Sequence, residues 1–233
     1  MNRPQKMNAF NLEMFQALQN ALLNWQADES ILYIFLDSSH EKAFSAGGDV
    51  SEVRQNHLTG ETHFAQNYFK VEYGLDYFIH KFPKPILCWS QGVVMGAGLG
   101  VMNGCSHRIV TQNTLMAMPE VKIGLFPDVG ASYFLNKISK NLGLFFALTG
   151  VSWSGEEACE FGLADFYLDS GDKEKVFSYL KSIPWGTFNR SEIHEVLNQE
   201  LKQMEGSLPK KEICLEGLDE VLQVNDFSEI HNI

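Results

Sequence analysis

Cysteine, basic residues and long apolar runs are all scarce in this sequence, and each scarcity excludes a class of protein. Four cysteines in 233 residues form no C-x-x-C pair, which argues against a disulfide framework or a zinc site and favours buried thiols in a reducing compartment. The net charge of −11 argues against nucleic acid or an anionic membrane as the main partner. No apolar run approaches the roughly 20 residues of a membrane-spanning helix, and residues 1–10 lack the apolar core of a secretory signal. We therefore expect a soluble intracellular protein.

Three motifs that would indicate a cofactor or a nucleophile are also missing. The seven histidines show no H-E-x-x-H or similar spacing, so we expect no metal site and interpret them as surface or capping residues. The G-x-G-x-x-G spacing of a dinucleotide-binding turn is not met from Gly96 or Gly98. Ser45 does not stand in a G-x-S-x-G elbow and has no evident histidine partner. These absences argue against metal, dinucleotide and serine-hydrolase chemistry.

Short apolar runs alternate with amphipathic segments along the chain, which is the order of an α/β layered fold. The hydrophobic content of 45% is enough for a sizeable core. A helix over 8–26 is predicted after two capping candidates, Asn8 and Asn11. Its apolar face has the spacing of a helix and consists of Phe15, Leu18, Leu22 and Trp25.

The remaining elements follow from the same patterns. We expect buried strands at 31–36, 84–92, 107–110 and 115–118. Residues 42–50 are interpreted as a Gly-rich turn. Helices are expected within 51–81, as one helix or a broken pair, within 94–104 and around 144–150, and a short helix leading into a strand is expected after residue 152.

The two ends of the chain differ from this α/β pattern. Residues 191–233 are acidic, Leu-spaced and predicted to be helical, whereas 1–190 is predicted to form the core domain. The chain opens on a turn-like N-R-P-Q and stops at S-E-I-H-N-I. We expect that a first strand is missing and that 191–233 begins an incomplete C-terminal region.

Two Gly-rich turns each follow a predicted strand. They are S-A-G-G-D at 45–49 and M-G-A-G-L-G at 95–100. Backbone N–H groups at such turns can point together at an anion or a developing oxyanion, because glycine permits close backbone approach. The two turns are therefore candidates for an oxyanion site.

Two acids stand in an apolar segment, M-P-E-V-K-I-G-L-F-P-D-V-G, at 118–130. Glu120 and Asp128 are separated by only one cation, Lys122. Either both acids line a cavity, or the segment is an ordinary loop whose acids point outward. A third acid, Glu72, lies within an aromatic stripe at 61–82 that is interpreted as core, and alone it would be interpreted as solvated.

Several of these motifs together resemble the crotonase (enoyl-CoA hydratase/isomerase) superfamily. They are N-R-P-Q-K-M-N-A-F, K-A-F-S-A-G-G-D-V, K-P-I-L-C-W-S-Q-G-V-V-M-G-A-G-L-G-V and the run through M-P-E-V-K-I-G-L-F-P-D-V-G, and they extend over residues 2 to about 168. G-L-F-P-D and the helix motif V-E-Y-G-L-D are most similar to the 3-hydroxyisobutyryl-CoA hydrolases of that superfamily. The resemblance implies a crotonase-type spiral of ββα units, usually assembled as an oligomer, and thioester hydrolysis in valine breakdown.

The resemblance also implies roles for individual residues. Glu120 and Asp128 match the catalytic acids of the hydrolases, and the N–H groups of Gly48 and Ala97 match their oxyanion hole. Gly100 stands where hydratases carry a first glutamate, so hydration of an enoyl-CoA is not favoured. The residues expected to bind the substrate are Glu72, Gly47, Asp49 and Gly96.

Two other functions stay open. An isomerase can work with a single glutamate such as Glu120, and a truncated relative can bind acyl-CoA without turnover. In each case CoA enters as part of the substrate, so no separate cofactor is expected. Lys6 and Lys42 are candidates for contact with its phosphates. The expected partner is an acyl-CoA in the cytoplasm, or in the mitochondrial matrix of a eukaryote, with no nucleic acid or membrane involved.

Overall fold

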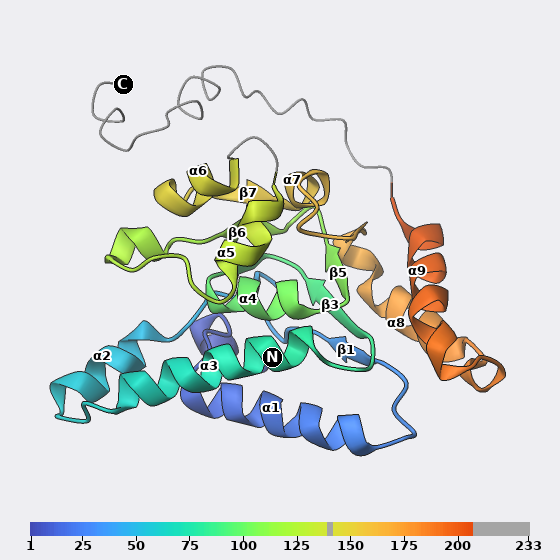
Figure 1. Ribbon diagram of the computed structural model, residues 1–233. Coiled ribbons are helices and arrows are strands. Elements are labelled where there is room, and N and C mark those ends of the chain that lie inside the picture. The colour runs from blue at the N-terminus through green and yellow to red at the C-terminus, as the bar shows by residue number, and fades with distance from the viewer. Residues whose placement is uncertain (139–141, 207–233) are drawn as a thin grey trace.

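The computed structural model describes residues 1–138 and 142–206, which form two four-stranded sheets flanked by helices (Figure 1). The first sheet has the order β1-β3-β5-β8, and its neighbouring strands are parallel. Its strands are β1 (Ile34–Leu36), β3 (Ile86–Ser90), β5 (His107–Val110) and β8 (Phe166–Tyr167). The second sheet has the order β2-β4-β6-β7, with only the last pair antiparallel. Its strands are β2 (Ala43–Ser45), β4 (Val93–Met95), β6 (Leu115–Ala117) and β7 (Trp153–Ser154).

Strands β1 to β6 alternate between the two sheets, and helices follow each pair, whereas β7 pairs with β6 in the second sheet and β8 returns to the first. Strands β1 and β2 lead into α2 (Val50–Leu58) and α3 (Phe64–His80), whereas β3 and β4 lead into α4 (Ala97–Gly104). This repetition is the spiral of ββα units that the resemblance implies. Residues 42–50 are not only a turn, as the sequence interpretation had it, because β2 lies within them and pairs with β4.

Helix α1 (Leu12–Ala27) confirms one capping prediction and corrects the other. Asn11 is the N-cap, and its side chain accepts a hydrogen bond of 3.0 Å from the N–H of Met14. Asn8 is fully buried at a positive φ of 53° and instead donates to the Ser38 hydroxyl, so it is not a cap. The predicted apolar face is shorter than expected, since Trp25 at its end is 37% exposed.

Residues 51–81 form a broken pair of helices, which is one of the two predicted arrangements. Gly60, in a left-handed conformation with φ of 93°, lies between α2 and α3. Tyr68 of α3 is buried as the aromatic stripe predicts. Glu72 is also buried, so a solvated position for it is excluded.

The second half of the described chain contains short helices around the two sheets. They are α5 (Ala131–Phe134), α6 (Leu142–Thr149), α7 (Gly155–Glu160), α8 (Lys173–Ser182) and α9 (Ile193–Met204). Single 3₁₀ turns are η1 (Pro4–Lys6), η2 (Glu120–Ile123), η3 (Leu135–Lys137), η4 (Ser170–Asp172), η5 (Trp185–Thr187) and η6 (Arg190–Glu192). Helix α9 confirms a helix within 191–233, and the rest of that prediction, from 207 onward, lies outside the described residues.

Buried apolar side chains form two clusters. The larger lies among the two sheets and helices α1, α3 and α4. The smaller, called here the second core, is covered by α8 and α9, which lie together at one side of the molecule (Figure 1). Its buried members are Leu87, Trp89, Ile109, Phe166, Leu168, Val176, Leu180, Ile193, Leu197 and Leu201.

One histidine contradicts the surface or capping interpretation. His107, at the start of β5, is fully buried beside the second core, and its ring lies 4.5 Å from that of His194. Burial, followed by the charge of His194, lowers the pKa of His107 to about 4. His107 is therefore a neutral packing residue at neutral pH.

Candidate active site

The carboxyl ends of three adjacent parallel strands bring the predicted site together. The turn at Gly47 and Gly48 follows β2, the turn at Gly96 and Ala97 follows β4, and Glu120 follows β6. A Cβ atom built on Gly96 would lie 2.7 Å from Glu120 Oε1 and 3.8 Å from the Cα of Gly47. The two turns and the glutamate therefore lie against one another, and only glycine at position 96, with φ of 46°, permits it.

Two backbone amides in these turns are free to donate. Ala97 is the first residue of α4, where an N–H has no acceptor within the helix. Among the described residues, no hydrogen bond occupies the N–H of Ala97 or that of Gly48. An oxyanion hole needs N–H groups that are unpaired in this way. The role of these two amides stays a prediction.

Asp49, a predicted substrate-binding residue, makes two contacts within the protein. Its carboxylate caps α2 by accepting from the N–H of Glu52, and it lies 2.8 Å from the Arg3 guanidinium. Burial tends to raise the pKa of Asp49, but the hydrogen bonds from Arg3 and Glu52 outweigh it and lower the pKa. Contact with a substrate is not tested by these observations. Lys6 and Lys42 are exposed, and their contact with phosphates also stays a prediction.

Four carboxyl groups form what is called here the acid cluster: Glu72 and Asp76 on α3, Glu120 on η2, and Asp128 in the following loop. Glu120 is 7% exposed. Burial raises its pKa to about 7, the charge of Asp128 adds to the rise, and a backbone N–H opposes it. Glu120 therefore does not point into solvent, which excludes an ordinary loop with both acids pointing outward.

Glu72 is the most strongly shifted acid for which a value can be given. It is 3% exposed, and burial, followed by the charges of Asp128, Asp76 and Glu120, raises its pKa to about 9. Glu72 is therefore protonated at neutral pH and can donate a hydrogen bond.

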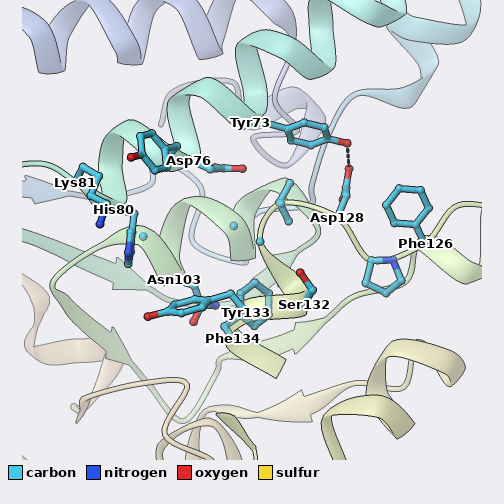
Figure 2. A pocket seen from close by; sticks show the side chains of 16 residues that line it. Tyr73, Asp76, His80, Lys81, Asn103, Phe126, Asp128, Ser132, Tyr133 and Phe134 are labelled. Atoms are coloured by element: carbon cyan, nitrogen blue, oxygen red, sulfur yellow. Dashed lines mark hydrogen bonds between the residues drawn. The ribbon is translucent and has the colours of Figure 1, made fainter. Parts of the chain in front are cut away.

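Asp128 is held by a tyrosine on α3. The Tyr73 hydroxyl donates a hydrogen bond of 2.7 Å to Asp128 Oδ2 (Figure 2). Burial raises the pKa of Asp128, and the bond from Tyr73 partly offsets that rise. Tyr73 was interpreted from the sequence only as part of a core stripe, yet it is 41% exposed and positions a predicted catalytic acid.

Asp76 is the member of the cluster that sequence reasoning missed. It follows Glu72 by four residues, so both project from the same face of α3, and that spacing is the signal that could have identified it. Both carboxylate oxygens are buried without a hydrogen-bond partner among the described residues. Burial, followed by the charge of Asp128, raises the pKa of Asp76 well above its usual range.

A cavity of about 620 Å³ borders one end of the cluster (Figure 2). Helices α3 and α4 and the loop that carries Asp128 line it, and Asp76 and Gly100 are among the lining residues. The lining does not include Glu120, Gly47, Gly48, Gly96 or Ala97, so the cavity borders the Asp76 and Asp128 end of the cluster. Its walls are largely aromatic, with Tyr77, Phe126, Tyr133 and Phe134.

Gly100 has a local steric reason to be glycine. A Cβ atom at this position would lie 2.5 Å from the Cβ of Val129 and 3.2 Å from Asp76 Oδ2. Val129 itself has a positive φ of 43°, which is strained for a β-branched residue. The space that a side chain at position 100 would enter is thus already filled by Val129 and the Asp76 carboxyl.

The described residues contain neither a metal-binding cluster nor a membrane-spanning helix. Among the described residues, no three or more histidine, cysteine or acidic side chains are placed to hold a metal ion. Within the same part of the chain, no helix is both long and apolar enough to cross a membrane.

Comparison with known proteins agrees with this geometry. The family model for enoyl-CoA hydratase/isomerase matches residues 1–232. The chain is 33% identical over 236 residues to the mitochondrial 3-hydroxyisobutyryl-CoA hydrolase of Gallus gallus, with 99% of this chain and 60% of that protein covered. It is also 33% identical over 215 residues to the small ribosomal subunit protein mS47 of Neurospora crassa, with 91% of this chain and 42% of that protein covered.

Solved structures show the same fold. The carnitinyl-CoA dehydratase from Mycobacterium thermoresistibile aligns with a TM-score of 0.84 and 30% identity, covering 99% of this chain and 64% of that one. The chain spans about three-fifths or less of the length of the two curated relatives above. The ββα spiral and the match along nearly the whole sequence lead to one conclusion: this chain belongs to the enoyl-CoA hydratase/isomerase, or crotonase, family.

Proposed function

We propose that this protein hydrolyses an acyl-CoA thioester, with 3-hydroxyisobutyryl-CoA as substrate and 3-hydroxyisobutyrate and CoA as products, a step of valine breakdown. The observation that carries the proposal is the buried carboxyl of Glu120, which lies against Gly96 beside the turns that carry the N–H groups of Gly48 and Ala97, unpaired among the described residues, in a site where position 100 carries no acid. The relative from Gallus gallus supports the substrate, and its mitochondrial location supports the matrix as compartment if the source is eukaryotic.

The reaction starts at the thioester carbonyl. Its oxygen accepts hydrogen bonds from the N–H groups of Gly48 and Ala97, which stabilise the negative charge that develops there. Glu120, with a pKa of about 7, is partly ionised at neutral pH and takes a proton from the attacking water. Direct attack by the Glu120 carboxylate on the carbonyl carbon is the other route open to the same group.

The proton has to reach the leaving sulfur. As the C–S bond breaks, Glu120 returns its proton to the thiolate. The hydroxyl group of the water is then part of the carboxylic acid, and its proton is on the thiol. Asp128, fixed by Tyr73, keeps negative charge close to Glu120 and shares the proton with it. Glu72, protonated at neutral pH, donates a hydrogen bond to the hydroxyl of the acyl group.

The test is a thiol-release assay with 3-hydroxyisobutyryl-CoA on the wild type, Glu120→Gln and Glu120→Ala. We expect both variants to lose roughly 10²- to 10⁴-fold in kcat, the usual contribution of a general base. Glu13→Gln, an exposed acid on α1, is the matched control and retains the wild-type rate. Equal rates for all four proteins would remove Glu120 from the mechanism.

A second candidate is a non-catalytic acyl-CoA-binding protein or subunit of an assembly. It is favoured by the relative from Neurospora crassa, which is named as a ribosomal protein. Thermal unfolding with and without CoA esters separates the two, since a ligand that binds only the folded state raises Tm. A rise in Tm without thiol release supports this candidate, and migration of a double bond without thiol release supports an isomerase.

A further inference from the structure

Unpaired oxygen atoms are concentrated in the acid cluster. Five buried side-chain nitrogen or oxygen atoms of the described residues lack a hydrogen-bond partner, and they belong to Glu72, Asp76, Glu120 and Trp153. Asp76 contributes two of them, since both of its oxygens are unpaired. Such atoms destabilise a folded protein, so a site that retains them is a candidate for ligand binding.

The spacing of two of these acids suits one hydroxyl group. Glu72 and Asp76 are four residues apart on α3, which places their Cβ atoms about 5–6 Å apart. Two hydrogen-bond partners of one oxygen atom, each about 2.7 Å from it, are separated by a distance similar to this Cβ spacing. A hydroxyl oxygen can therefore lie between the two carboxyl groups. A hydroxyl both donates and accepts, and a protonated carboxyl does the same.

The position of Asp76 is set by its neighbours. Its Oδ2 lies against Gly100, where any Cβ would come within 3.2 Å, and Val129 fills the adjacent space. The residue itself lines the cavity that Asp128 also borders. A ligand in that cavity can therefore reach Asp76 once its side chain turns from Gly100 toward the cavity.

We propose that Asp76 is a specificity-determining residue, whose carboxyl forms a hydrogen bond with a hydroxyl carried by the acyl chain, which it holds together with Glu72. The site then selects hydroxyacyl-CoA esters over unsubstituted ones, because an acyl chain without the hydroxyl leaves both buried acids unpaired. Burial raises the pKa of Asp76 well above its usual range, which favours the protonated form that can donate a hydrogen bond. This inference rests on the proposed function.

The experiment compares 3-hydroxyisobutyryl-CoA with isobutyryl-CoA, which differs only by the hydroxyl. The ratio of the two kcat/KM values for thiol release is measured for the wild type, Asp76→Leu and Asp76→Asn. We expect the ratio to fall about ten-fold or more in Asp76→Leu, because one hydrogen bond to the hydroxyl is lost. Asp76→Asn, whose amide still donates, retains most of the preference.

Two further variants test whether the change in the ratio is due to the carboxyl of Asp76. Glu174→Gln, at an exposed acid on α8, is the matched control and keeps the wild-type ratio. Asp76→Ala removes the carboxyl without adding bulk, and we expect it to lower the ratio in the same direction as Asp76→Leu. If Asp76→Leu does not fold, Asp76→Ala decides the question.

Failure of this inference is distinguishable from failure of the proposed function. An unchanged ratio in folded Asp76→Leu or Asp76→Ala, with thiol release intact, overturns the role of Asp76 alone. If the wild type releases no thiol from either ester, the proposed function fails, and the two Kd values are compared by calorimetry instead. A Kd preference for the hydroxyacyl ester that Asp76→Leu loses then supports the role of Asp76, and equal Kd values overturn it.

Discussion

The acid cluster and the second core are both shielded from water, but they differ in how their buried groups are paired. The second core consists of apolar side chains, and the indole N–H of Trp89 in it donates to Gln91. In the acid cluster, burial places four carboxyl groups near one another and leaves several of their oxygens unpaired. Burial under α8 and α9 therefore stabilises the fold. Beside α3, burial raises the pKa values of the acids and lowers the stability of the folded protein.

Removing a side chain from the second core gives the largest expected effect on stability. Leu197→Ala leaves a cavity beneath α9, and we expect the free energy of unfolding to fall by about 2–5 kcal/mol. Urea unfolding followed by circular dichroism measures it, with Leu23→Ala on the exposed side of α1 as control. Thiol release per folded molecule stays at the wild-type level; a specific loss of turnover would break the separation between the two regions.

Replacing an acid of the acid cluster by its neutral amide is expected to raise the free energy of unfolding. At pH 7 Glu72 is protonated in the folded protein, where its pKa is about 9, but ionised in the unfolded chain, where it is near 4.5. Folding must therefore take up a proton, and Glu72→Gln removes that requirement, a gain of about 3 kcal/mol at pH 7.

The pH dependence of this gain has a definite sign. Because the pKa of Glu72 is raised on folding, its contribution to stability is fully present below pH 4.5 and is lost as pH rises toward 9. The difference between Glu72→Gln and the wild type should vanish at pH 4 and grow with pH, as urea midpoints will measure. A variant that is less stable than the wild type at pH 7 would contradict the assignment of Glu72 as a destabilising acid.

A third prediction concerns the pH profile of turnover. If Glu120 acts as a base, kcat/KM rises with pH around its pKa of about 7. Because the charge of Asp128 raises that pKa, Asp128→Asn should move the midpoint of the residual activity to lower pH. Stopped assays from pH 5 to pH 9 measure the midpoint, and an unchanged midpoint would show that the two acids are not coupled.

The smallest effect is expected at Tyr73. Tyr73→Phe removes the hydrogen bond that offsets the raised pKa of Asp128, so that pKa rises further. We expect thiol release at pH 7 to fall roughly two- to five-fold, as for one partly exposed hydrogen bond, and to recover at higher pH. Tyr77→Phe is the matched control, since Tyr77 lines the same cavity. Equal losses in both variants would assign the effect to the cavity wall rather than to Asp128.

Much of the fold could be predicted because its signals are local. Apolar runs of a few residues predicted the strands β1, β3, β5 and β6, and Asn11 identified the start of α1. The prediction for Asn8 was wrong because its side chain finds a distant partner, Ser38, that no local pattern reveals. His107 was misinterpreted for the same reason, since its burial depends on α9, far along the chain.

The candidate site divides in the same way. Its glycines and acids, including Glu120 and Asp128, could be identified from motifs, and their catalytic and binding roles stay predictions. Asp76 was missed although it follows Glu72 by four residues, since the pattern at Gly100 indicates only a missing acid. The structure shows that a carboxyl from another helix lies next to that position.

The sequence by itself determined most of the segments that become strands and helices, with β2 as an exception, because apolar periodicity and glycine conformation act over a few residues. Only the tertiary structure decided which of the acids meet. Parallel pairing of β2, β4 and β6 brings Gly47, Gly96 and Glu120 into contact. The packing of α3 against α4 then buries Asp76, and the proton affinity of each acid depends on solvent exclusion and neighbouring charge, which exist only once distant segments have come together.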